Sequence, residues 1–359
     1  GTGPGGTRIY RDTEDLGAKH MIIFYCMANG NPPVEIEVSD IRFQGMETKI
    51  HEGDEGSDAY FRGIAFRACD FHLHDCLFEY FSREAVGVSH PQSGGLGLIY
   101  NNEFRQCIAL RNDGDFTHSY GIGVGTWGDP VSWADAHPGT DDFVFIEDNY
   151  FTMLRPGVAS GQGAKYVFRH NVAENTSSES SVAEMHPAQP DWGWDYPYSA
   201  RFAEIYGSIF VGVPEGHPLH VSNGERPISL RGGESVIHSN IFRNLAHSVH
   251  WWVGGAWYSD YYDFPSDYAG PESPVPYQVG YESAVAYGPD HTGTDPDTYG
   301  KGDSFIWNNT YDNTGEPYAS SPVTYNGTEF DVLKEGRDYH VEVARPEYTP
   351  YEYPHPRRR

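Results

Sequence analysis

One short phrase returns along the chain: an apolar residue, a small polar residue three positions later, and in most copies an aromatic residue two positions after that. It recurs at Ile99–Phe104, Ile146–Phe151, Phe168–Ala173, Ile205–Phe210, Ile237–Phe242 and Ile306–Tyr311. Two earlier copies, Val38–Phe43 and Leu73–Phe78, keep the aromatic residue but not an Asn before it. Self-similarity at a loose period of about 20 to 50 residues is typical of solenoids. Strand-type repeats with Asn at the bend favour a parallel β-helix.

The spacing of the repeats agrees with this interpretation. The shortest step, from Phe151 to Ala173, is what one coil of three short strands needs, and the longer steps are a coil plus a loop. The Asn amides should bond one another at equivalent bends and tolerate left-handed backbone there; these residues are Asn102, Asn149, Asn171, Asn240 and Asn309. We therefore expect an all-β solenoid of about nine to eleven coils. A β-sandwich also has many short strands, but it does not predict aligned Asn-x-aromatic phrases.

The chain is expected to form one solenoid domain over residues 1–315. Two aromatic-rich loop excursions interrupt its rhythm, at residues 176–200 and 251–304. From residue 316 to 359 the repeat fades into a Pro/Tyr-rich segment, which we interpret as a cap because a solenoid must cover its last coil.

Charge narrows the range of partners. The 359 residues include 24 basic and 51 acidic side chains, a net charge of −27, which argues against binding to nucleic acid. It suits a soluble extracellular protein and a bound Ca²⁺. The apolar run at 21–28 is far shorter than the roughly 20 residues that span a bilayer, so no membrane insertion is expected. No signal peptide stands at the N-terminus, and we expect a processed or truncated mature chain.

Several segments carry a family resemblance. They are Val167–Asn171, Glu184–His186, Arg201–Tyr206, Leu230–Gly233, Gly336–Tyr339 and Tyr348–Pro356. Together they resemble secreted bacterial right-handed parallel β-helix repeat proteins of the pectate-lyase-like superfamily, well over residues 150–359 and only generically before. The resemblance implies a right-handed parallel β-helix and export more than it implies a reaction. The chain departs from the pattern at His186-Pro187, where His-Gly is expected, and at Ser208, where Asn is usual.

Polysaccharide lyases on such folds need a cation to neutralise the uronate carboxylate, a base for the neighbouring proton, and a groove. His186 beside Glu184 is our candidate base. Arg169, Arg201 and Arg231 would form a cationic strip if they stack on one face, with Arg201 and Arg231 in the catalytic site and Arg169 binding substrate. The alternative is that these arginines balance acidic ladders on the surface.

Metal binding is a second possibility. Asp113 and Asp115 offer two carboxylates at alternate positions, half of a possible Ca²⁺ site, although a solvated loop is the simpler explanation because the further ligands are lacking. His72 and His74 point to one face of a strand with metal-ligand spacing, but no third ligand is evident. The pair Asp141-Asp142 is similar to the carboxylates of polygalacturonase-type hydrolases, whose accompanying signatures are absent here, so we reject that family.

Other candidates are aromatic, glycosylated or sulfur-containing. The tryptophans of the two excursions are suited to stacking on sugars or to anchoring protein interfaces; they are Trp192, Trp194, Trp251, Trp252 and Trp257. Three sequons predict glycosylation in a secretory pathway that supports it, at Asn175, Asn308 and Asn326. Cys107 is expected in the core, and Cys69 could pair with Cys76.

Two functions remain open. The first is a secreted protein that recognises carbohydrate, with lyase-like activity on an acidic polysaccharide as the enzymatic form of that hypothesis. The second is a non-catalytic structural protein of a cell surface, sheath or extracellular filament, assembled with other copies through its aromatic loops and its basic tail. A glycan-binding adhesin without turnover is a third, weaker possibility.

Overall fold

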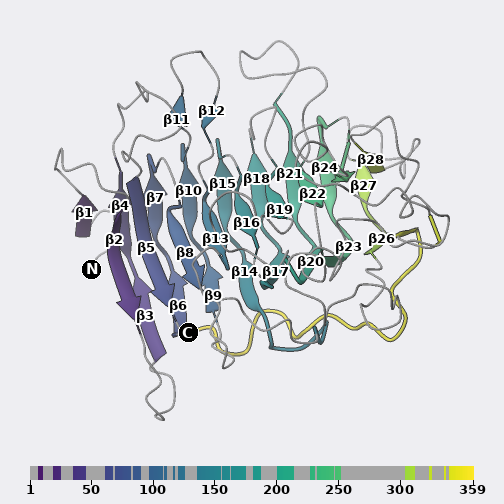
Figure 1. The fold of residues 1–359 in the computed structure, drawn as a ribbon, viewed down its shortest axis with the longest axis horizontal. Helices are drawn as coiled ribbons and strands as arrows, with labels where there is room; N and C mark the ends of the chain where they lie inside the picture. The colour runs from purple at the N-terminus through teal and green to yellow at the C-terminus, as the bar shows by residue number, and fades with distance from the viewer. Residues whose placement is uncertain are drawn as a thin grey trace, which may run out of the picture.

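The protein is built almost entirely from parallel strands. The computed structural model describes residues 7–10, 19–25, 35–45, 61–67, 69–81, 84–89, 97–107, 109–110, 116–117, 120–125, 136–154, 156–161, 163–174, 181–186, 200–213, 227–230, 233–245, 247–251, 304–311, 323–325, 335–336 and 339–359. Over these residues it is all-β and contains no helix. Successive strands join three nine-stranded sheets in turn, the arrangement expected of a parallel β-helix (Figure 1).

We name the three sheets A, B and C in the order in which the chain visits them. Sheet A contains β1 (Thr7–Tyr10), β4 (Ile41–Gln44), β7 (Leu77–Glu79), β10 (Glu103–Arg105), β15 (Tyr150–Thr152), β18 (Val172–Glu174), β21 (Ile209–Val211), β24 (Ile241–Arg243) and β27 (Thr310–Tyr311). Sheet B contains β2 (Lys19–Tyr25), β5 (Phe61–Arg67), β8 (Val86–Ser89), β13 (Ile122–Val124), β16 (Val158–Ser160), β19 (Ala183–Met185), β22 (Ile228–Leu230), β25 (Val249–Trp251) and β28 (Val323–Tyr325). Sheet C contains β3 (Glu35–Ser39), β6 (Asp70–His74), β9 (Gly97–Tyr100), β14 (Val144–Glu147), β17 (Lys165–Arg169), β20 (Phe202–Tyr206), β23 (Glu234–His238), β26 (Ser304–Trp307) and β29 (Tyr339–Val341). A separate antiparallel pair joins β11 (Ala109–Leu110) to β12 (Phe116–Thr117).

The core lies inside the three sheets and is held by stacked rings. The aromatic residue of each repeat points inward from sheet A, and four of these rings stack at centroid distances of 4.8, 5.0 and 4.9 Å; they are Phe43, Phe78, Phe104 and Phe151. Ala173 interrupts the column, and Phe168 of sheet C fills the gap between Phe151 and Phe210. The repeat phrase is therefore a packing device, because each ring covers the one in the coil before it.

The predicted Asn ladder is confirmed. The side-chain oxygen of Asn149 accepts from the backbone N–H of Asn102 at 2.9 Å and from its side-chain amide at 3.0 Å. Asn149 donates in turn to Asn171, and Asn240 donates to Asn309 in the same way. Ser208 continues the ladder with its hydroxyl, which accepts from the N–H of Asn171 at 3.1 Å.

One detail of the bend differs from expectation. The left-handed backbone belongs to the residue before each ladder position: φ is +54° at Asn101, +55° at Asp148, +54° at His170 and +57° at Ser239. The ladder residue itself is buried because its amide must reach the neighbouring coils, whereas the residue before it makes the turn. Cys76 takes a ladder position and is a free thiol, so the suggested Cys69–Cys76 disulfide is wrong.

The outer face of sheet C carries apolar side chains beside several buried charged ones. A second cluster covers its outer face, formed by Leu98, Tyr100, Phe143, Phe145, Val167, Phe202, Tyr206, Val236 and Phe305. What packs on it includes the end of the chain, which we call the tail (residues 342–359). Figure 1 shows the tail running back along sheet C after β29 and ending near β6 and β9, in the N-terminal half of the stack. The strands β28 and β29, which precede it, pair with β25 and β26.

Candidate functional site

Glu184 and His186 lie together on the outer face of sheet B. Alternation along β19 directs Ala183 and Met185 into the core, which places Glu184 on the outer face. His186 follows at the end of the strand, and its Nε2 lies 3.5 Å from the Glu184 carboxylate. The structure thus brings together the two residues that the sequence assigned to proton transfer.

The backbone around His186 is held from two sides. Its N–H donates to the carbonyl of Ser160 at 2.7 Å, and its own carbonyl accepts from the N–H of Ala200 at 3.0 Å. The ring meets the edge of Tyr120, with a centroid distance of 6.0 Å and an interplanar angle of 85°. The side chain is partly exposed, whereas its Nε2 is buried and faces Glu184 without a hydrogen bond.

Two further polar residues follow Glu184 along the same column of sheet B. Glu184 is in register with Ser229 of β22, which is in register with His250 of β25. Adjacent parallel strands are about 4.8 Å apart, so these side chains are neighbours along the stack. All three are buried. In the other direction the column continues through the small residues Ala159 and Gly123.

The arginine strip expected from the sequence does not form between Arg169 and Arg201. Arg169 ends β17 and is in register with Glu147 and Tyr206 of the neighbouring strands. Arg201 lies just before β20, at the opposite end of these strands, and its Nη1 is 2.8 Å from the carboxylate of Glu234. Arg231 lies outside the described residues.

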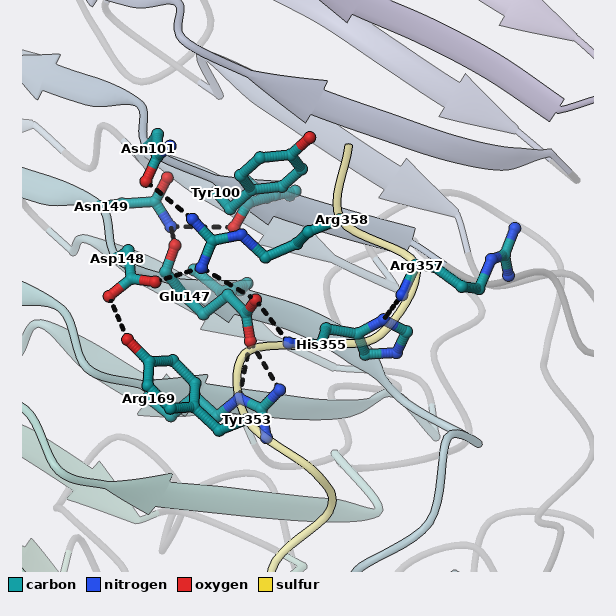
Figure 2. A network of polar contacts seen from close by, with 12 residues as sticks. Tyr100, Asn101, Glu147, Asp148, Asn149, Arg169, Tyr353, His355, Arg357 and Arg358 are labelled. Carbon is teal, nitrogen blue, oxygen red and sulfur yellow. Dashed lines mark hydrogen bonds and ion pairs between the residues drawn. The ribbon is translucent and has the colours of Figure 1, made fainter.

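Arg169 is completely buried, and its guanidinium contacts the tail. Its Nε donates to Glu147 at 2.7 Å, and Glu147 is equally buried. The two terminal nitrogens donate to the backbone carbonyls of Tyr351 and Glu352, at 2.8 and 2.9 Å. Glu147 completes the arrangement by accepting from the backbone N–H of His355 at 3.1 Å (Figure 2). The pair therefore contacts both donors and acceptors of the tail backbone.

The rest of the tail contacts sheet C in sequence order. Arg345 is 3.3 Å from Glu234, and the hydroxyl of Tyr348 donates to Glu204 at 2.7 Å. Arg358 pairs with Asp148 and donates to the side chain of Asn101, and Arg359 donates to Glu37 of β3 at 2.6 Å. The tail thus reaches from β23 back to β3 instead of ending over the last strands.

Burial shifts several pKa values along this face. It raises the pKa of the Glu204 carboxyl, although the N–H of Gly139 and the hydroxyl of Tyr348 both donate to it. Burial lowers the pKa of His355 to about 4, with help from the nearby Arg169 and Arg357. It also lowers the pKa of His238 to about 4. Both imidazoles are therefore neutral at pH 7.

The histidine pair His72 and His74 is engaged by carboxylates of the adjacent strand. His72 Nε2 lies 3.0 Å from Glu35, and His74 Nε2 lies 3.3 Å from Glu37. The described residues contain no group of three or more His, Cys, Asp or Glu side chains that could hold a metal ion. Asp113 and Asp115, the predicted Ca²⁺ ligands, lie outside them.

The remaining predicted residues are mostly outside the described part of the chain. These are Trp192, Trp194, Trp252, Trp257, Asn175 and Asn326. Trp251 ends β25, and the structure does not describe its side chain. Asn308 is exposed at the turn between β26 and β27, where a glycan would have room, and its glycosylation stays a prediction.

Sequence reasoning missed Ser229, His250 and the partners of the tail. Ser229 and His250 could have been found by aligning the short sheet-B segments Val158–Ser160, Ala183–Met185, Ile228–Leu230 and Val249–Trp251, whose central residues form the outer column. Glu147 lies within the repeat phrase Ile146–Phe151, at a position where the sequence pattern indicates no particular function.

Comparisons add no relative. A search with this chain finds no match among protein-family models, curated proteins or solved structures. No helix long and apolar enough to cross a membrane is found in the described part of the chain.

Proposed function

We propose that the protein is a secreted, extracellular protein that recognises carbohydrate, a right-handed β-helix of pectate-lyase-like type with lyase-like activity on an acidic polysaccharide. The observation that carries this proposal is the Glu184–His186 pair on the outer face of sheet B, beside Ser229 and His250. The outer face of sheet C is less suited to a glycan, since the tail already lies on that face.

The pair is suited to a β-elimination. The His186 imidazole, whose Nε2 is 3.5 Å from the Glu184 carboxylate, would take the proton next to a uronate carboxylate. The electron pair left on that carbon forms the double bond and expels the glycosidic oxygen, which takes the proton back from the imidazolium, and Glu184 stabilises this imidazolium while it exists. Ser229, one strand further on, lies beside Glu184 and is buried. The positive charge that neutralises the uronate would come from Arg231 or from Ca²⁺ held with the help of Asp113 and Asp115.

The test is a panel of uronate polysaccharides, with turnover followed by the ultraviolet absorbance of the unsaturated product and binding followed on a glycan array. His186→Ala should lower kcat/KM by about 10²-fold or more, as expected for loss of a general base. His137→Ala is the matched control, because His137 is exposed and far from β19 in sequence; its activity should equal that of the wild type. A protein that binds no glycan and releases no unsaturated product would refute the proposal.

A second candidate function is a structural protein of a cell surface, sheath or filament. It is favoured by the complementarity between the basic tail and the acidic residues of β3 and β6, where Arg357 and Arg359 pair with Glu35, Glu37 and Asp70. Electron microscopy of the purified chain separates the two: ordered filaments without glycan turnover would support this candidate, and discrete particles would count against it.

A further inference from the structure

The contacts of the tail resemble those of a bound peptide more than those of another strand. Residues 342–359 contain no strand, and the tail lies on the outer face of sheet C without extending any sheet. Residues 342–344, the first part of the tail after β29, are exposed. Most of what holds the tail is therefore a set of non-covalent contacts made beyond this short connection.

The face recognises the backbone of the tail with buried charges. Arg169 donates to two successive tail carbonyls, and Glu147 accepts from a tail N–H. Both side chains are fully buried, and they also pair with each other. A buried charged group that bonds backbone atoms gives strong and directional hydrogen bonds. Gly139 adds a close approach, because a Cβ there would stand 2.1 Å from the carbonyl oxygen of Thr349.

The face also recognises side chains. Glu204 accepts from the hydroxyl of Tyr348, the ring of Tyr353 stacks on His170 at 3.7 Å, and the ring of His355 meets the edge of Phe145 at 4.5 Å. The Arg358 guanidinium lies over the ring of Tyr100, 4.5 Å from its centroid, a cation–π contact. Because these contacts fall at fixed positions along the tail, the face should recognise the amino-acid sequence of a peptide as well as its positive charge.

We propose that the outer face of sheet C is a peptide-binding surface whose ligand is the C-terminal segment 345–359. The surface makes the same contacts with this segment whether the segment belongs to its own chain or to a second copy. The covalent connection raises the effective concentration of the segment, which keeps the intramolecular form dominant. Exchange of the segment between copies then needs only movement at residues 342–344, as in domain swapping.

The experiment uses the full chain. A protease site replaces the exposed residues Val343 and Ala344, the folded protein is cleaved, and size-exclusion chromatography shows whether the released segment stays bound. A fluorescein-labelled synthetic peptide 345–359 is then added, and its exchange into the cleaved protein is followed by anisotropy. We expect the segment to co-elute with the body and the labelled peptide to replace it.

Peptide variants test the recognition. Tyr348→Phe and Arg358→Gln peptides should each bind about tenfold more weakly, because each removes one partner of a carboxylate of the face, Glu204 or Asp148. A Pro346→Ala peptide is the matched control and should bind like the parent sequence, since Pro346 is exposed. A scrambled peptide with the same arginines should bind at least about tenfold more weakly.

Three results would overturn the proposal. The first is loss of the segment from a body that stays folded by circular dichroism, and the second is equal binding of the scrambled peptide. The third result applies if the cleaved protein is unstable without the segment. Excess free peptide should then raise its melting temperature, because a ligand that binds the native state stabilises it. An unchanged melting temperature would count against the surface.

Discussion

Replacing Arg169 tests the buried ion pair under the tail. Arg169 makes four hydrogen bonds, to Glu147, Tyr206, Tyr351 and Glu352. In the Arg169→Met variant Glu147 stays fully buried, with only the N–H of His355 and the more distant Arg358 as partners. Removing one partner of a buried pair costs about 3–5 kcal/mol of unfolding free energy. The two remaining partners place our expectation near the lower end, about 3 kcal/mol.

The double variant Arg169→Met/Glu147→Leu gives the sharper measurement. Replacing both side chains by apolar groups leaves neither charge of the pair without its partner. The loss of unfolding free energy in the double variant should therefore be smaller, by about 2 kcal/mol, than the sum of the losses in the two single variants. Unfolding free energies come from urea titration, followed by far-ultraviolet circular dichroism and by tryptophan fluorescence. The two probes must give one transition, because a stack of repeats can unfold in parts.

The control for charge removal is Arg105→Met. Arg105 is exposed and pairs with Glu103 on the surface, so its loss should change stability by no more than about 0.5 kcal/mol. If the effects of Arg169→Met and Glu147→Leu simply add to within about 0.5 kcal/mol, the two charges are not coupled and our account of the tail site is wrong.

Two further predictions concern the same face. Because the pKa of His355 and of His238 falls from 6.5 to about 4 on folding, the unfolded chain binds these protons at a higher pH than the folded chain does. The unfolding free energy should therefore decline as the pH falls from about 6.5 to 4, by up to about 1.4 kcal/mol per pH unit for each histidine. Urea titrations across this pH range should show the slope, and His355→Gln should reduce it. Gly139→Ala should displace the tail, since Gly139 has a φ of +81° and a Cβ would collide with the Thr349 carbonyl; limited proteolysis should then cut the tail much faster than in the wild type, and an unchanged cleavage rate would contradict this contact.

The repeat phrase made the interior of the protein predictable. Most phrases place one ring in the core and one amide in the ladder, and both features depend only on residues a few positions apart. The same logic failed by one residue at the bend, where Asp148 and His170, not the ladder Asn residues, adopt left-handed backbone. The period alone cannot distinguish the residue that makes the turn from the residue that bonds across it.

The outer surface was less predictable because its contacts are long-range. Arg169 meets a carbonyl 182 residues away, and Arg358 meets an Asn 257 residues away. The sequence did indicate that the basic residues 357–359 would bind an acidic surface, but it could not show whether that surface belongs to the same chain or to another copy. It also could not show that Arg169 and Arg201 sit at opposite ends of their strands, which depends on register.

The two outer faces explain how one coil geometry can serve two purposes. On sheet C two outward columns carry large side chains, Phe145 in one and Tyr206 and Trp307 in the other, and the tail covers part of them. On sheet B the outward column passes from Gly123 and Ala159 to Glu184, with the imidazole of His186 still partly exposed. Ala159 and Glu184 are themselves buried, so the imidazole of His186, at the end of β19, is the part of this pair that solvent reaches. Because the tail occupies the outer face of sheet C, the glycan site that we propose lies at the end of β19 on sheet B, where the imidazole of His186 is partly exposed.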